Sequence, residues 1–158
     1  MKYENTDIVF QEIPDETTLA INITNCPCHC PGCHSKYLWN DIGQPLTTQT
    51  IDQFINTYGA SITCISFMGG DSNPDEIDKL AAYVHQTYPH TKVAWYSGRS
   101  QLSSLVNTDN LDYYKIGPYL KHLGPLKSPT TNQRIYRKEA DGSWTDITNR
   151  MQSNGIKP

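Results

Sequence analysis

The sequence predicts an α/β fold in which mostly parallel strands form an open, partial (β/α) barrel with a β-hairpin near the C-terminal end. Segments with strand-like and helix-like apolar spacing alternate along the chain and are joined by short connections. Such alternation indicates parallel strands linked by right-handed helical crossovers. The chain has 158 residues, fewer than the roughly 250 of a closed eight-stranded barrel. We therefore expect a single domain, residues 1–158, whose barrel stays open.

The first half is expected to contain an edge strand, a second strand, a helix and a buried strand, at residues 8–10, 17–24, 47–59 and 62–68. The second strand has apolar residues at alternate positions, Leu19, Ile21 and Ile23. The helix has an apolar face at helical spacing and ends at Gly59, a residue type common at helix C-termini. The buried strand is a continuous apolar-rich run, as expected for a strand covered on both faces.

The second half is expected to contain a helix, a strand, a short helix, another strand and a hairpin, at residues 74–88, 92–96, 99–106, 111–116, 134–138 and 144–147. Pro74 is typical of a first helical turn, and the two acidic residues that follow it suit the positive end of a helix. Gly142 lies in the predicted turn of the hairpin. These elements complete the alternating pattern.

Charge and composition exclude several classes of function. The chain has 13 basic and 16 acidic residues, a formal net charge of -3, and no long run of either sign. We therefore expect no binding to nucleic acid or to an anionic membrane. The first residues lack the features of a signal peptide, and no apolar run is long enough to span a bilayer. These observations predict a cytoplasmic protein.

Four of the five cysteines lie within eight residues: Cys26, Cys28, Cys30 and Cys33. Three residues separate the first from the third, and two separate the third from the fourth. This spacing lets Cys26, Cys30 and Cys33 bind one iron–sulfur cluster and leave one iron without a protein ligand. The alternate position of Cys28 predicts that its side chain points away from this triplet, as a bystander. Cys64 lies in an apolar segment and is expected to be a buried, inert thiol.

Zinc is the alternative metal for this loop. Four cysteines, or cysteines together with His29 and His34, could complete a tetrahedral site. Structural zinc sites usually take their ligands from two separated knuckles, and the sequence contains no second knuckle. An iron–sulfur cluster is therefore favoured, and both histidines are expected to be solvated loop residues.

The motif CPCHCPGC at residues 26–33 resembles the three-cysteine signature of the radical S-adenosylmethionine (radical SAM) enzymes. Its CPGC ending, followed by His34 and Trp39, is similar to that of the anaerobic ribonucleoside-triphosphate reductase activating proteins. Further segments resemble motifs of the same family: MGGD, WYSG, DYYKIGPY and SPTTNQR, at residues 68–71, 95–98, 112–119 and 128–134. One departure is Gly32, where many radical SAM enzymes have an aromatic residue.

The resemblance implies a [4Fe-4S] cluster whose open iron binds S-adenosyl-L-methionine. It implies that Gly69, Gly70 and Asp71 bind the cofactor, with the Asp71 carboxylate on the methionine ammonium; alone, this tripeptide is as typical of a plain turn. Ser97 and Gly98 would meet the ribose or methionine end. Arg99 could pair with the cofactor carboxylate, although a solvated arginine fits the sequence better. Asn132, Gln133 and Arg134 match the family without an assigned role.

The activity implied by the resemblance is that of a glycyl radical enzyme activase, a radical SAM oxidoreductase. One electron from the reduced cluster would cleave S-adenosylmethionine to methionine and a 5'-deoxyadenosyl radical, which would take hydrogen from a glycine of anaerobic ribonucleoside-triphosphate reductase. A reduced flavodoxin-like protein would supply the electron, and no catalytic residue is expected beyond the cluster ligands. Two alternatives stay open: an activase of another glycyl radical enzyme, and a noncatalytic zinc or iron–sulfur binding module.

Overall fold

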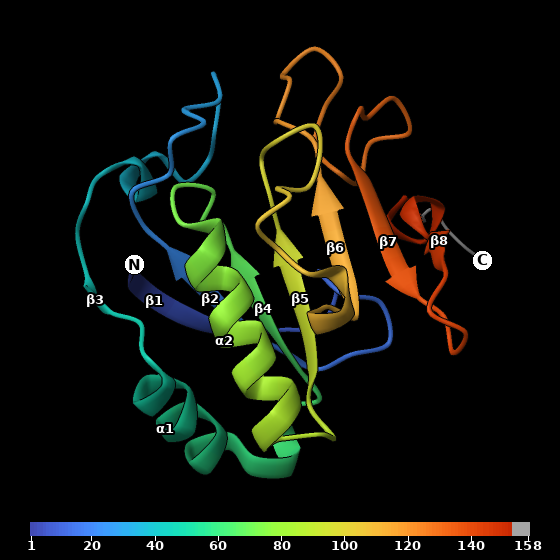
Figure 1. The fold of residues 1–158 in the computed structure, drawn as a ribbon. Coiled ribbons are helices and arrows are strands. Elements are labelled where there is room, and N and C mark those ends of the chain that lie inside the picture. Colours follow the sequence, from blue (N-terminus) through green and yellow to red (C-terminus); the bar gives the residue numbers. More distant parts are fainter. Residues whose placement is uncertain (153–158) are drawn as a thin grey trace.

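One mixed sheet of eight strands forms the centre of the structure, a computed structural model that describes residues 1–152 (Figure 1). The strand order across the sheet is β3-β1-β2-β4-β5-β6-β7-β8. The strands are β1 (Lys2–Val9), β2 (Thr18–Ile23), β3 (Gln44–Pro45), β4 (Cys64–Met68), β5 (Lys92–Tyr96), β6 (Tyr113–Ile116), β7 (Arg134–Lys138) and β8 (Trp144–Asp146). Strands β3 and β8 are the two edges of the sheet.

The four central strands are parallel and the flanking strands are antiparallel. Strand β4 pairs in parallel with β2 and β5, and β5 pairs in parallel with β6. The other four pairings are antiparallel. The expectation of mostly parallel strands therefore holds for the centre of the sheet and not for the sheet as a whole. The carboxyl ends of β2, β4, β5 and β6 meet at one edge, where α/β proteins place their ligand sites.

Two α-helices cover one face of the sheet, α1 (Thr48–Tyr58) and α2 (Pro74–Thr87) (Figure 1). Helix α1 begins at a capping box in which the side chains of Thr47 and Thr50 each accept a hydrogen bond from the other's backbone amide. Helix α2 begins with proline and two acidic residues, as predicted. Their apolar faces pack on buried strand residues such as Ile65, Phe67 and Trp95. None of the helices in residues 1–152 is long and apolar enough to cross a membrane.

The other face of the sheet is covered by irregular segments. Ile13 from the β1–β2 connection, Leu126 from the β6–β7 connection and Met151 from the 3-10 helix η4 (Thr148–Met151) pack on it. Their strand partners include Tyr113 and Ile135, and this second core covers the face opposite α1 and α2 without an α-helix.

Two expected elements differ in the structure. Residues 99–106 form bends and turns instead of a helix. Ser97 and Ser103 explain the difference, because their hydroxyls accept hydrogen bonds from the amides of Arg99 and Leu105 and so compete with a helical turn. The first strand runs over Lys2–Val9, far beyond residues 8–10, because pairing with β2 holds its polar residues in place. The predicted hairpin is confirmed as the antiparallel pair β7–β8.

Candidate metal centre and cofactor site

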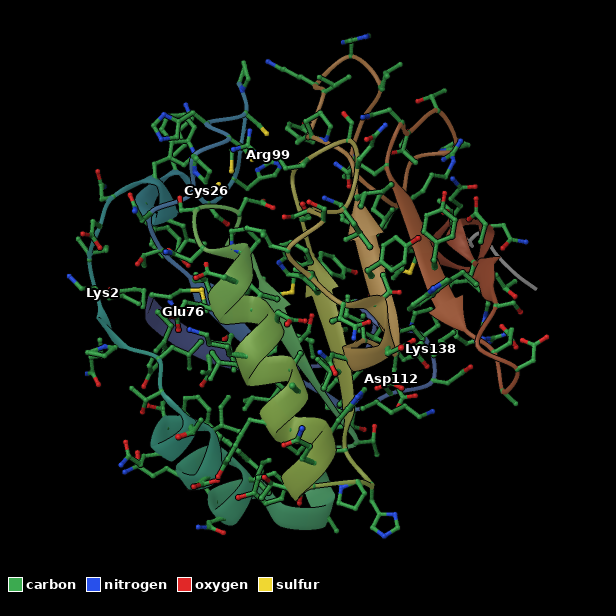
Figure 2. All side chains as sticks on the ribbon, viewed as in Figure 1. Lys2, Cys26, Glu76, Arg99, Asp112 and Lys138 are labelled. Atoms are coloured by element: carbon green, nitrogen blue, oxygen red, sulfur yellow. The ribbon has the colours of Figure 1, made fainter. Side chains whose placement is uncertain are left out.

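The predicted site segments follow the carboxyl ends of the four parallel strands. The cysteine loop (residues 24–35) follows β2, the Gly-Gly-Asp segment follows β4, Ser97 and Gly98 follow β5, and Gly117 follows β6. Because these strand ends are adjacent in the sheet, segments that are far apart in the sequence become neighbours. Figure 2 shows Cys26 and Arg99 at this same end of the sheet. The fold therefore gathers the predicted residues at one edge.

The cysteine loop is held against a 3-10 helix, η1 (Lys36–Trp39). The Cys26 amide donates a hydrogen bond to the Leu38 carbonyl at 2.9 Å, and Leu38 is buried. The His29 ring stacks on Trp39 with 4.5 Å between ring centroids and 10° between planes. His29 is nevertheless exposed, as the sequence suggested, with one face of its ring against Trp39. Trp39 fixes the loop from outside the cysteine motif.

The four loop cysteines are free thiols of intermediate exposure. A hydrogen bond from Cys28, with further bonds from two backbone amides, holds the pKa of Cys26 below its usual range despite the opposing effect of burial. The same contact raises the pKa of Cys28. The Cys33 sulfur accepts a hydrogen bond from the Ser35 amide at 3.3 Å. The lowered pKa of Cys26 favours its thiolate, the form that binds iron.

The prediction that Cys28 points away from the other cysteines is wrong. Its thiol contacts Cys26 and lies 3.7 Å from Oδ2 of Asp71. A Cβ at Gly98 would lie only 2.9 Å from the Cys28 sulfur. The alternation argument fails because the loop is not extended: His29 takes a left-handed φ of 45°. Cys28 therefore faces the region predicted to bind the cofactor.

Asp71 is the centre of the predicted cofactor residues. Its Oδ1 accepts a hydrogen bond from the Ser97 hydroxyl at 2.6 Å, and its Oδ2 accepts one from the Gly98 amide at 2.8 Å. Gly69 and Gly70, with φ of 106° and 94°, turn the chain so that the carboxylate reaches this position. A Cβ at Gly70 would also lie 2.6 Å from Cδ1 of Ile77 on α2. Only glycine fits there.

Lys115 is a site residue that the sequence reasoning missed. It lies on β6, its side chain is buried, and its Nζ donates to the carbonyls of Ser97 at 3.0 Å and Gly117 at 2.9 Å. Burial lowers the pKa of Lys115 to about 8, although the negative charges of Asp71 and three loop cysteines act in the opposite direction. The available signal was a charged residue on a predicted strand, two positions after Tyr113 and therefore on the same face as that apolar ring.

The motif SPTTNQR, at residues 128–134, supports the segment that follows β6. The Asn132 and Gln133 side-chain amides donate to the Pro118 carbonyl at 3.0 and 3.5 Å. These two residues hold the segment that follows β6, which is a structural task. Arg134 begins β7, and its guanidinium donates to the Thr131 and Gln133 carbonyls.

Cys64 lies at the start of β4, remote from the cysteine loop along that strand. It has no exposed surface, and burial raises its pKa well above the usual value. The predicted buried, inert thiol is confirmed.

The cysteine loop has the donor set of an iron–sulfur cluster. Within residues 1–152, no three cysteine, histidine or acidic side chains converge closely enough to hold one metal ion. A zinc ion needs its ligands around one point, whereas each thiolate of a [4Fe-4S] cluster binds a different iron. Three partly exposed thiols on one loop, two of them with donors to sulfur, fit the larger group.

Comparison with protein families identifies an iron–sulfur domain in the chain. A family model described as a 4Fe-4S single cluster domain matches residues 17–120. The match covers about two thirds of the chain and runs from β2 to just beyond β6, so it includes every strand end that forms the site. No curated protein and no solved structure matches the chain. The chain is an iron–sulfur protein and belongs to the 4Fe-4S single cluster domain family.

Proposed function

We propose that the protein is a radical SAM activase, which reductively cleaves S-adenosyl-L-methionine to generate a glycyl radical on anaerobic ribonucleoside-triphosphate reductase. One observation carries the proposal: Asp71, Ser97 and Gly98 form a hydrogen-bonded unit directly beside the cysteine loop. An iron–sulfur module that only stored or passed electrons would need no oriented carboxylate at the open side of its cluster. A cofactor that carries an ammonium group would need such a carboxylate.

In this proposal Cys26, Cys30 and Cys33 hold the cluster, which when bound supplies the single electron that breaks a carbon–sulfur bond of the cofactor. Asp71 binds the methionine ammonium. The Ser97 hydroxyl and the Gly98 amide each occupy one acceptor position of the carboxylate, which fixes its plane. A carboxylate has about four such positions, so acceptor sites remain for the ammonium.

The sheet supports a protein substrate. Strands β3 and β8 stay at opposite edges in the described residues, so the strands do not close into a barrel. We propose that this is the open, partial barrel expected from the sequence, and that its unclosed side admits a glycine-bearing loop of the reductase. A reduced flavodoxin-like protein is the proposed electron donor.

The test is anaerobic reconstitution with iron and sulfide, followed by reduction with dithionite and measurement of 5'-deoxyadenosine. We expect cofactor cleavage by the native chain and by Cys64→Ala, and none by Cys26→Ala. Co-expression with the anaerobic reductase should then produce the glycyl radical signal in electron paramagnetic resonance (EPR). A reduced cluster that yields no 5'-deoxyadenosine would leave an iron–sulfur binding module. Cleavage without a radical on this reductase would indicate an activase of another glycyl radical enzyme.

A further inference from the structure

We propose that Lys115 is a fixed positive charge at the metal centre, and that it raises the reduction potential of the [4Fe-4S] cluster. The inference rests on the proposed cysteine ligation, and it assigns Lys115 a task that neither the cysteine motif nor the cofactor residues perform. In this proposal Lys115 acts through its charge and touches no reacting atom.

The position of the ammonium group is set by the backbone. Its Nζ donates to the carbonyls of Ser97 and Gly117, which lie just beyond the carboxyl ends of β5 and β6. Lys115 has a relative exposure of only 8%. An ammonium has three donors, and the structure shows two of them used by these carbonyls. Because backbone groups hold the charge, its place does not depend on whether a cofactor is bound.

The groups that face Lys115 are mostly negative or polarisable. Asp71 beyond β4 acts on it as a negative charge, and Cys26 and Cys30 of the cysteine loop beyond β2 do the same in their thiolate form. The Tyr96 ring on β5 lies 5.8 Å from Nζ. No side chain in residues 1–152 forms a salt bridge with Lys115 within 4.0 Å. A buried ammonium without a paired anion is costly, so an anionic group bound beside it is the expected counter-charge.

A cluster held by three thiolates is such an anion. Reduction adds one negative charge to it, and the attraction to a nearby cation grows with that charge. In a site of low dielectric the attraction extends further than in water. Lys115 therefore stabilises the reduced state more than the oxidised state. If Lys115 served only to tie the segments after β5 and β6 together, the same two hydrogen bonds would be present, and the reduction potential would not depend on its charge.

The experiment compares Lys115→Gln, Lys115→Met and Lys115→Arg with the native chain. Each protein is reconstituted anaerobically without S-adenosylmethionine, and dithionite titration followed by EPR gives the midpoint potential. Gln and Met should shift the potential to more negative values, with about a tenfold lower ratio of reduced to oxidised cluster at a fixed potential. Arg should restore most of the native value. The Gln and Arg proteins decide the question if Met fails to fold.

Lys138→Gln is the matched control. Lys138 is also a strand lysine whose Nζ donates to a backbone carbonyl, that of Thr108, and it lies over the Trp144 ring. Figure 2 shows it beside Asp112, far from Cys26. Its replacement should leave the potential unchanged. Equal potentials for native and Lys115→Gln proteins would overturn the proposal and reduce Lys115 to a structural tie.

Measuring 5'-deoxyadenosine on the same samples separates this inference from the proposed function. A potential that depends on Lys115 in a protein that cleaves no cofactor would end the activase proposal and leave the role of Lys115 standing. Cofactor cleavage with a potential insensitive to Lys115 would do the reverse. A native chain that forms no cluster would overturn both.

Discussion

The two ends of the parallel strands both carry buried charged groups, but within residues 1–152 only the buried charge at the amino end has an ionic partner. There, Glu16 accepts hydrogen bonds from the Thr63 hydroxyl, the Lys92 ammonium and the Tyr113 hydroxyl, at 2.7, 3.0 and 2.8 Å. At the carboxyl end, Asp71 and Lys115 are bonded to neutral groups, and neither has an ionic partner in residues 1–152.

The difference separates a structural charge network from a ligand site. A buried carboxylate that has a cation and two hydroxyls around it stabilises the fold and needs no further partner. A carboxylate and an ammonium held apart, beside four thiols, keep their charges available for a bound group. The comparison predicts that changes at the amino end reduce the free energy of unfolding, and that changes at the carboxyl end reduce ligand binding.

The largest expected effect is at the cysteine loop. Replacing Cys26, Cys30 or Cys33 with alanine removes one of only three protein ligands, so the [4Fe-4S] cluster should be lost. The measurements are iron content and visible absorbance after anaerobic reconstitution. Each variant should lose the cluster almost completely, while circular dichroism shows that the sheet remains.

Cys28→Ala and Cys64→Ala are the controls for this prediction. Both should retain the cluster, Cys64 because it is buried in the core and Cys28 because the three-then-two spacing does not include it. Loss of the cluster in Cys28→Ala equal to that in Cys26→Ala would contradict the ligand assignment. Cys28 would then be a fourth protein ligand and would occupy the iron that is proposed to bind the cofactor.

The sequence predicted the apolar framework well because burial leaves a periodic pattern. Alternation predicted β2, helical spacing predicted α1 and α2, and an apolar-rich run predicted β4. The polar strand β1 was mostly missed, since pairing with β2 and not apolar spacing holds it. Residues 99–106 were misread because serine side chains, which leave no apolar pattern, compete with the helix.

The candidate site was predicted in parts. Asp71, Ser97 and Gly98 were found from motifs, but their mutual hydrogen bonds depend on which strands are neighbours. The direction of Cys28 depends on the left-handed backbone at His29, and a histidine in the sequence does not predict that conformation. Lys115 was passed over because a lysine is usually exposed, and only the tertiary fold turns it inward.

Glu16→Ala should produce the largest loss of stability at the amino end. It leaves the Lys92 ammonium and two hydroxyls without their acceptor, and the unfolding free energy should fall by about 3 kcal/mol. Urea unfolding measures the change, with exposed Glu4→Ala as a control that should differ little from the native chain. Cluster content should stay native. A loss of cluster in a folded Glu16→Ala protein would break the separation between the two ends.

Asp71→Asn tests the other side of the comparison. The change keeps the shape of the side chain and removes its charge, so binding of S-adenosylmethionine should weaken by about 2 kcal/mol, or roughly 30-fold. Calorimetric titration of the reconstituted protein measures this, and the unfolding free energy should change by less than that of Glu16→Ala. Ser97→Ala, which removes one bond to Asp71, should weaken binding by a smaller factor. Unchanged affinity in both variants would remove the carboxylate from the cofactor site.

The smallest effect is the pH dependence of Asp112 at the amino end. Burial raises the pKa of this carboxyl. Hydrogen bonds from His85 and the Val93 amide, together with the charges of His85 and Lys138, lower the pKa by more than burial raises it. The net pKa is therefore below the usual 3.8. The unfolded state then binds more protons than the folded state near pH 4. The stability from Asp112 is therefore present above about pH 4 and is lost as the pH falls through the folded pKa.

Asp112→Asn isolates this contribution. The native chain should exceed the variant by about 1 kcal/mol in unfolding free energy at pH 6, and the gap should close as the pH falls below 4. Urea unfolding of cluster-free protein gives the difference, because acid release of iron then plays no part and other carboxyls affect both proteins alike. A gap that stays constant from pH 6 to pH 3 would mean that the Asp112 charge adds nothing. Charge at the amino end would then contribute to the free energy of unfolding through Glu16 and not through Asp112.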